Sequence, residues 1–154
     1  MIQRIQTVYL FFASAFLFSM FFFPLVEIIG ADATYYRYDL FGIHEGMGET
    51  ARLTMSVFPL RFLVFVSASL SLFIIFLYRR RIFQIRLCIF NIVLNLGFYA
   101  LFFFYYHHAT RDIEAETYFK LPVVFPVVAI IFLYLAIRNI GKDEVLVRSY
   151  NRIR

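Results

Sequence analysis

The chain has 154 residues, of which 62% are hydrophobic and 21% aromatic, and its mean hydropathy is +0.77. This composition leaves too little polar surface to cover a water-soluble core, which excludes an ordinary soluble domain. The formal net charge of +5 does not indicate nucleic-acid binding, because the sequence shows no continuous basic face with interleaved stacking aromatic residues. We therefore expect a membrane protein with no nucleic-acid partner.

Four apolar runs without a single charged residue follow one another along the chain. They cover residues 8–26, 62–78, 87–106 and 121–137, and each is 17 to 20 residues long. A helix of this length crosses a hydrocarbon core of about 30 Å and satisfies its own backbone hydrogen bonds there. The runs predict an all-α membrane protein, a four-helix transmembrane bundle that forms a single integral membrane domain.

The charges between the runs predict the topology. With their flanks, the spans cover about 8–29, 55–78, 87–106 and 119–138, separated by outer loops 30–54 and 107–118, an inner loop 79–86 and a tail 139–154. Ten Lys and Arg residues fall on the side of the termini and the inner loop, and four fall on the side of the outer loops. Because basic loops stay cytoplasmic, we expect a multi-pass protein of the bacterial inner membrane with cytoplasmic N- and C-termini.

Two segments outside the spans have a distinctive residue composition. The aromatic stretch Tyr35–Phe41 in the first outer loop is followed by glycines, which favours one or two short strands. The tail after Gly141 reads as a short amphipathic helix that lies on the membrane surface. Basic residues at the cytoplasmic face are expected to anchor the protein to anionic headgroups; these are Arg79, Arg80, Arg81, Arg86, Arg148 and Arg152.

Several short motifs resemble one family. They are the N-terminal residues 1–10, the stretch 84–88 running into Asn91, and the C-terminal stretches 137–138, 142–144, 146–149 and 152–154. In these motifs, and in length and span number, the chain resembles a family of small four-span inner-membrane proteins from Bacteroidetes-type bacteria, known only as a domain of unknown function. The resemblance implies an integral inner-membrane protein and supplies no catalytic residues.

Glu27 and Arg61 form the first candidate site. Glu27 is predicted to end the first span, and Arg61 to begin the second on the same side of the membrane. Ionisable groups near the hydrocarbon are costly unless they pair or reach the interface. We expect a boundary ion pair or a snorkelling arginine, and the alternative is a coupling carboxylate for transport.

Asn91 and Asn95 form the second candidate site, because the spacing of four residues places both amides on one face of the third span. Buried amides in a bundle usually hydrogen-bond to neighbouring helices. An interhelical polar face is therefore the favoured interpretation, with a polar ion track as the alternative.

His44, His107 and His108 form the third candidate site. Imidazoles near outer-loop carboxylates suit Zn²⁺ or another divalent ion, but adjacent histidines on a helix point apart and no recognised ligand spacing is present. Solvated histidines are the alternative. Motifs typical of phosphate binding, metalloproteases and serine hydrolases are absent from the sequence, so we predict no cofactor and no enzyme activity.

These features favour a structural or accessory protein that acts through lipid or partner contacts. The partners we expect are the bilayer, its anionic headgroups at the cytoplasmic face, and a second copy or another membrane protein. A small oligomeric transporter or channel is the alternative function, and an outer-face metal site is a further one.

Overall fold

The structure is a computed structural model and describes residues 3–30, 34–46, 52–78, 80–111 and 115–152. Within these residues the chain forms four α-helices, α1 (Gln3–Ser19), α2 (Phe58–Phe76), α3 (Arg81–Thr110) and α4 (Phe125–Arg152), with a 3₁₀ turn η2 (Leu121–Val124) before α4. The same residues contain five strands, β1 (Val26–Gly30), β2 (Tyr35–Tyr38), β3 (Ile43–Glu45), β4 (Arg52–Met55) and β5 (Ala115–Phe119).

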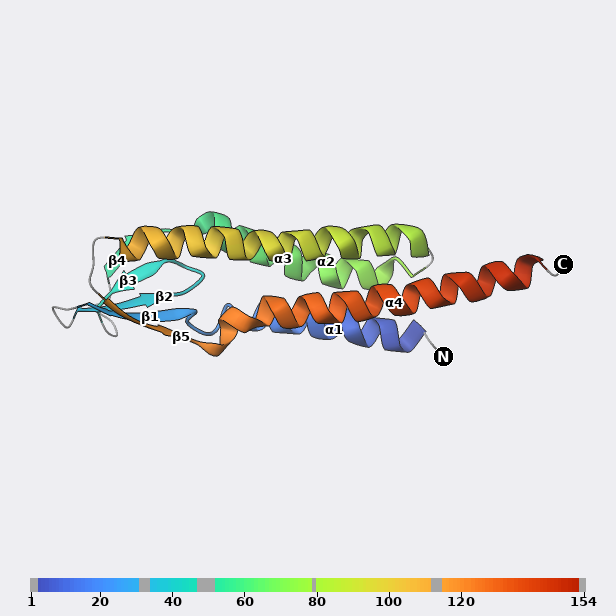
Figure 1. Cartoon of the computed structure of the whole chain (residues 1–154), viewed down its shortest axis with the longest axis horizontal. Coiled ribbons are helices and arrows are strands. Elements are labelled where there is room, and N and C mark those ends of the chain that lie inside the picture. The colour runs from blue at the N-terminus through green and yellow to red at the C-terminus, as the bar shows by residue number, and fades with distance from the viewer. Residues whose placement is uncertain (1–2, 31–33, 47–51, 79, 112–114, 153–154) are drawn as a thin grey trace.

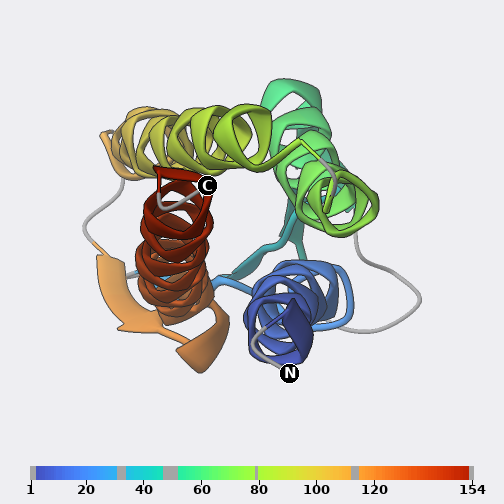
Figure 2. The same ribbon diagram turned by 90° about the vertical axis from the view of Figure 1, so that its right-hand side faces the viewer.

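The helices form a bundle in which α1 and α3 each pack against both α2 and α4 (Figure 2). Apolar side chains such as Leu10, Val64, Phe98 and Leu133 fill its centre. The outward faces carry many exposed large apolar residues, which is the arrangement that a hydrocarbon solvent requires. In the described residues, three helical stretches are long and apolar enough to cross a membrane, namely Phe58–Phe76, Arg81–Thr110 and Leu121–Lys142. The apolar stretch of α1, Ile5–Ser19, is shorter.

A five-stranded antiparallel sheet, in the order β4-β3-β2-β1-β5, lies at one end of the bundle (Figure 1). Both chain termini lie at the opposite end. The sheet includes the connections from α1 to α2 and from α3 to α4, so every helix enters or leaves the bundle beside it. The molecule therefore has a helical part and a sheet part arranged along one axis.

The two faces of the sheet differ. The covered face packs against the last turns of α3, where Tyr38 stacks on Phe102 at 5.4 Å between ring centroids and the Tyr106 hydroxyl lies 3.1 Å from Thr117 Oγ1. The open face carries the alternate side chains, among them Glu27, Arg37, His44 and Tyr118, and these are partly or largely exposed. Because side chains alternate along a strand, one apolar and one polar face arise from the same short segments.

The expected first span, 8–29, is wrong at its outer end. The helix stops at Ser19, and after Pro24 the chain becomes β1, which pairs with both β2 and β5. The β-branched residues Val26, Ile28 and Ile29 suit a strand, and Pro24 interrupts the helical hydrogen bonding. The expectation of one or two strands in the first outer loop was also too low, because β2, β3 and β4 all lie there and β1 and β5 extend the sheet.

The other predicted boundaries also shift. The span expected at 55–78 begins at Phe58, because Thr54 and Met55 belong to β4. The helix expected at 87–106 runs from Arg81 to Thr110, so the inner loop 79–86 and the outer loop 107–118 are shorter than predicted. The span expected at 119–138 begins with the end of β5 and η2.

The predicted break at Gly141 was wrong as well. The backbone of α4 continues through Gly141 to Arg152, so the tail is the end of a long helix and not a separate short one. A glycine inside a helix costs only about 1 kcal/mol and removes no backbone hydrogen bond. The end of α4 therefore projects beyond the rest of the bundle (Figure 1).

Candidate functional site

A closed polar network joins α2 and α3 inside the bundle; its members are Ser67, Ser71, Asn91 and Asn95, all buried. The Ser67 hydroxyl donates to Asn91 Oδ1 at 2.6 Å, and the Asn91 amide donates to the Ser71 hydroxyl at 2.8 Å and to the Ser67 carbonyl at 3.1 Å. The Asn95 amide donates to the Ser67 hydroxyl at 2.9 Å. The two predicted asparagines thus lie together, and both contact α2.

The side-chain hydrogen-bond donors of the network all find acceptors within the protein. Each serine hydroxyl both donates and accepts, since the Ser71 hydroxyl also donates to the Ser67 carbonyl at 3.2 Å. The Asn95 amide also donates to the Asn91 carbonyl, one turn back on its own helix. Groups satisfied in this way bind the helices to each other. The two serines complete the site, and their spacing of four residues places both on one face of α2.

Glu27 does not pair with Arg61, so that predicted ion pair is corrected. Because Glu27 lies on β1 instead of a helix end, its nearest cation is Lys120, which directly follows the neighbouring strand β5, and their charged atoms are 2.7 Å apart. Burial, together with the nearby Glu27 carboxylate, raises the pKa of the Tyr35 hydroxyl. Glu27 therefore belongs to a polar cluster on the open face of the sheet.

Arg61 lies in the first turns of α2 and contacts aromatic rings. Its guanidinium carbon is 5.5 Å from the ring centre of Phe41 and 5.3 Å from that of Phe58. A cation over an aromatic face gains about 0.5–1 kcal/mol at a partly exposed position. Phe41 belongs to the turn between β2 and β3, so Arg61 ties the sheet to the helical bundle.

The turn between β2 and β3 is fixed by the buried carboxylate of Asp39. Asp39 Oδ1 accepts hydrogen bonds from the backbone N–H groups of Phe41 and Gly42 at 2.8 and 3.1 Å. Asp39 Oδ2 accepts from Arg37, and His44 Nε2 lies 3.7 Å from Oδ1. This carboxylate shapes the hairpin, and sequence reasoning missed it because it lies in an otherwise aromatic stretch.

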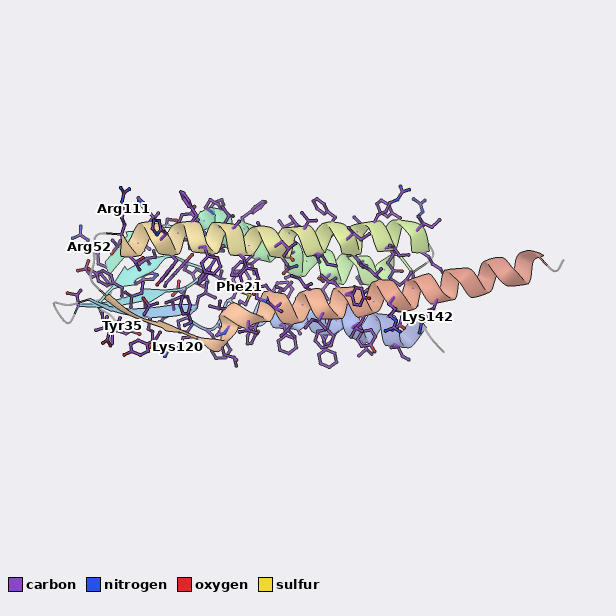
Figure 3. The ribbon with its side chains drawn as sticks, viewed as in Figure 1. Phe21, Tyr35, Arg52, Arg111, Lys120 and Lys142 are labelled. Carbon is purple, nitrogen blue, oxygen red and sulfur yellow. The ribbon has the colours of Figure 1, made fainter. Side chains whose placement is uncertain are left out.

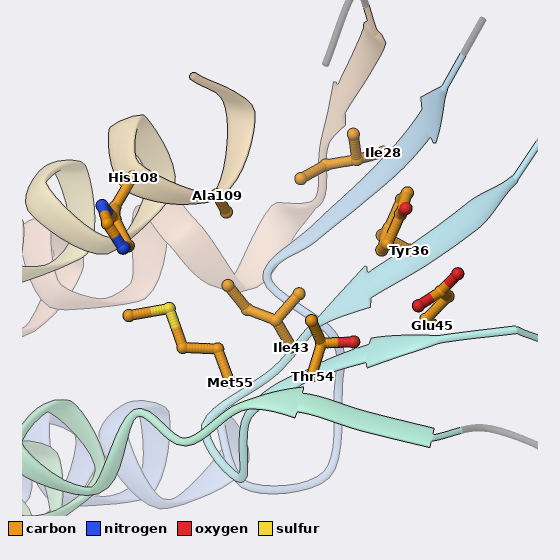
Figure 4. Close-up of a pocket in the computed structure, with 8 residues that line it drawn as sticks. All are labelled: Ile28, Tyr36, Ile43, Glu45, Thr54, Met55, His108 and Ala109. Carbon is orange, nitrogen blue, oxygen red and sulfur yellow. The ribbon is translucent and has the colours of Figure 1, made fainter. Parts of the chain in front are cut away.

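A cavity of about 380 Å³ lies between the covered face of the sheet and the last turn of α3 (Figure 4). Apolar side chains form most of its wall, and the remaining side chains are Tyr36, Thr54, Glu45 and His108. The apolar residues are Ile28, Ile43, Met55 and Ala109. No local sequence pattern indicates this cavity, because its lining comes from four strands and one helix that are far apart in the chain.

The three predicted histidines lie on two elements, β3 and α3. His44 lies on β3 on the open face, whereas His107 and His108 lie near the end of α3, and only His108 lines the cavity. Among the described side chains, no group of three or more His, Cys, Asp or Glu lies close enough to hold a metal ion. The described geometry therefore does not bring the proposed ligands together.

The predicted surface anchors lie at the end of the molecule opposite the sheet. Arg80 and Arg86 are exposed, and Arg81 is half-buried at the start of α3. Arg79 and the side chains of Arg148 and Arg152 lie outside the described part of the structure. Figure 3 shows Lys142 near this end, whereas Arg52, Arg111 and Lys120 lie near the sheet, so charges gather at both ends with apolar helices between them.

These observations define the class of protein: a mostly helical protein with long apolar helices of membrane-spanning character and a five-stranded antiparallel sheet. The chain belongs to the family described as "Domain of unknown function (DUF4293)", whose model matches residues 2–153. None of the curated proteins compared with it gives a significant match. The family covers nearly the whole chain, in agreement with the resemblance seen in the sequence, and it assigns no activity.

Proposed function

We propose that the protein is a non-enzymatic accessory protein of the bacterial inner membrane, in which four transmembrane helices hold the sheet at the outer surface for contact with a protein partner. The observation that carries this proposal is the contrast between the buried polar network and the exposed polar groups of the sheet. Polar groups that are already satisfied inside the bundle are poor candidates for binding a passing solute.

The edge strands of the sheet support the proposal. Within the described residues, β4 and β5 each pair on one side only, and the side chains of Arg52, Leu53 and Thr54 on β4 are exposed. An exposed edge presents unpaired backbone donors and acceptors, to which an extended segment of another protein can add as a further strand. Binding of such a partner requires no catalytic group in either protein.

The orientation follows from the charge distribution. The sheet lies at the end with few basic residues, and both termini lie at the basic end. The positive-inside rule then places the termini in the cytoplasm, with the basic residues against anionic headgroups. α1 is the fourth span in this arrangement, since its 17 residues reach about 25 Å, near the lower limit for crossing the hydrocarbon core.

A photo-crosslinking experiment in the native host tests the partner. A benzophenone amino acid at Leu53 on β4, or at Tyr118 on β5, should give a discrete protein adduct. The same probe at Phe90, an exposed position in the middle of α3, serves as the control and should label lipid. Discrete adducts from Phe90 alone, or lipid labelling from all three positions, would contradict contact through the sheet.

Labelling in intact cells tests the orientation. In a Cys88→Ala background, a cysteine at Leu53 should react with a membrane-impermeant maleimide from the outside, and a cysteine at Arg80 should react only after lysis. The reverse pattern would show that the sheet faces the cytoplasm.

The alternative, a small transporter or channel, makes a different prediction. Protein in liposomes would then carry an ion or solute, and Asn95→Leu and Glu27→Gln would reduce that flux. We expect no flux above that of empty liposomes, and flux that falls with either change would overturn the accessory function.

A further inference from the structure

We propose that the cavity between the sheet and α3 binds a small lipophilic ammonium compound, with its cationic group beside Glu45 and its apolar part among Ile28, Ile43 and Met55. The proposal goes beyond the accessory function and does not require the protein partner suggested above. It rests on the size of the cavity, on its wall and on its charge, which are argued in turn.

The size and wall of the cavity suit a small organic molecule. A volume of about 380 Å³ lies within the range of roughly 300–1,000 Å³ that is typical of ligand pockets. Such pockets are mostly apolar, with a few polar groups that fix the orientation of the ligand. Ile28, Ile43 and Ala109 provide the apolar wall here, and Thr54 adds one hydroxyl.

The charge of the lining favours a cation. Among the described residues of the wall, Glu45 is the one carboxylate, and neither Lys nor Arg is present. In the described part of the chain, the Glu45 carboxylate lies within salt-bridge distance of no basic group, although Arg52 is its partner across the β3–β4 pair. An unpaired carboxylate at the rim of an apolar cavity attracts a cation and repels an anion.

An aromatic ring stands next to this carboxylate. Tyr36 and Glu45 are direct partners across the β2–β3 pair, and both line the cavity (Figure 4). An ammonium group beside Glu45 is therefore close to the Tyr36 ring, and cation–π attraction adds to the charge attraction. The thioether of Met55 lines the far part of the cavity beside His108, where it can adapt to the apolar end of the ligand.

The experiment uses two probes of the same shape in the full-length protein, reconstituted in zwitterionic nanodiscs at pH 8, where histidine side chains are in general uncharged. Benzyltrimethylammonium carries the cation, and 2,2-dimethylpropylbenzene is its uncharged isostere. The readout is the NMR shift of the ¹³C-labelled methyl group of Met55, which reports binding at this site and ignores partitioning into the bilayer. The methyl group of Met20, buried in the bundle, is the internal reference.

We expect the ammonium probe to shift the Met55 signal with about tenfold higher affinity than the isostere, the combined effect of one partly exposed charge contact and one cation–π contact. Glu45→Gln should weaken binding of the cation about fivefold and leave the isostere unchanged. Glu116→Gln is the matched control, because it removes the same charge from the open face of the same sheet and should leave both affinities as they are.

Ala109→Phe provides a second variant that fills the cavity without touching Glu45, and it should abolish the Met55 shift by either probe. An unchanged Met20 signal will show that each variant is folded. Equal affinity for the two probes, or cation binding that is indifferent to Glu45→Gln, would overturn the proposal. Tighter binding of benzenesulfonate than of the ammonium probe would overturn it too, and would indicate that Arg52 governs the site.

Discussion

The helical bundle and the sheet handle their polar side chains in opposite ways. In the bundle, Asn91 and Asn95 hydrogen-bond to two serines of α2, and water has no access to them. In the sheet, Glu27 and Lys120 pair while both remain partly exposed, and Glu45 lies at the rim of a cavity without a counter-ion among the described residues. The bundle thus uses its polar groups for assembly, whereas the sheet keeps some of its own available.

The difference follows from the two solvents. An unsatisfied polar group in hydrocarbon is costly, so a transmembrane bundle retains polar residues where they bind each other. The polar side chains of the sheet are partly or largely exposed, so an unpaired carboxylate such as that of Glu45 costs little there. The effects of substitutions on stability should therefore differ in size and sign between the two parts.

The largest effect is expected in the bundle. Asn91→Leu removes the centre of the polar network and leaves the Ser67 hydroxyl without its acceptor, so the free energy of unfolding should fall by about 2–3 kcal/mol. Ser69→Ala, on the same helix as Ser67 but outside the network, should change it by less than about 0.5 kcal/mol. Unfolding by SDS titration from a mild detergent measures both, and equal midpoints would show that the network does not hold α2 and α3 together.

A slightly smaller loss of stability is expected from a substitution in the turn between β2 and β3. A Cβ atom added at Gly42 would overlap Leu53 Cδ1 and lie 2.7 Å from the Met55 backbone oxygen, so Gly42→Ala should cost about 2 kcal/mol through the displacement of β4. Gly141→Ala, with nothing within 4 Å of the added atom, should instead stabilise by about 0.5–1 kcal/mol. Faster hydrogen exchange of the β3 and β4 amides in Gly42→Ala would locate the loss, and protection equal to the wild type would contradict it.

A gain in stability is expected from a substitution at the contact between the sheet and the bundle. Tyr38 is fully buried, and its hydroxyl has no hydrogen-bond partner in the described structure. Tyr38→Phe keeps the stacking on Phe102 and removes the unsatisfied group, which should stabilise by about 1 kcal/mol.

Tyr99→Phe is the matched control for Tyr38→Phe. The Tyr99 hydroxyl donates to the Val123 carbonyl at 2.7 Å, so the same change should destabilise by about 1 kcal/mol. Thermal unfolding of the two variants under identical conditions should show opposite signs, and a shared sign would show that hydrogen bonding does not decide the outcome.

The smallest effect is a change in stability at alkaline pH, and it arises from tyrosines on the open face of the sheet. Burial and Glu27 raise the pKa of Tyr35, and the hydrogen bond to Glu116 raises that of Tyr118. A raised folded-state pKa gives stability that is fully present below the unfolded value of about 10 and is lost as pH rises through the folded value. The double variant Tyr35→Phe/Tyr118→Phe should therefore lose less stability above pH 10 than the wild type does. If the free energy of unfolding falls equally steeply with pH in the variant and the wild type, these hydroxyls do not contribute to the loss of stability above pH 10.

The sequence predicted the helices well because each apolar run is long and free of charge. It also placed Asn91 and Asn95 on one face, since their spacing fixes this in any helix. The position of Glu27 was wrong because the apolar run continues smoothly through Phe22 and Phe23 into β1, and hydropathy does not distinguish a helix from a strand there. Pro24 was the available signal.

The cavity and the sheet could not be predicted for a different reason. β5 joins β1 although about ninety residues separate them, and such long-range pairing leaves no local pattern. Glu45 and His108 line one cavity only because β3 pairs with β2 and α3 docks on the sheet. Gly141 shows the opposite case, because its local helix-breaking preference is outweighed by the continuous hydrogen bonding of α4.

The uninterrupted α4 has a mechanical consequence. Its 28 residues make a rod of about 42 Å, and η2 joins that rod directly to the edge strand β5. A tilt of about 10° at the sheet end would move the far end by about 7 Å, given that length. A force on β5 would thus be transmitted to the far tip of α4 through one continuous helix.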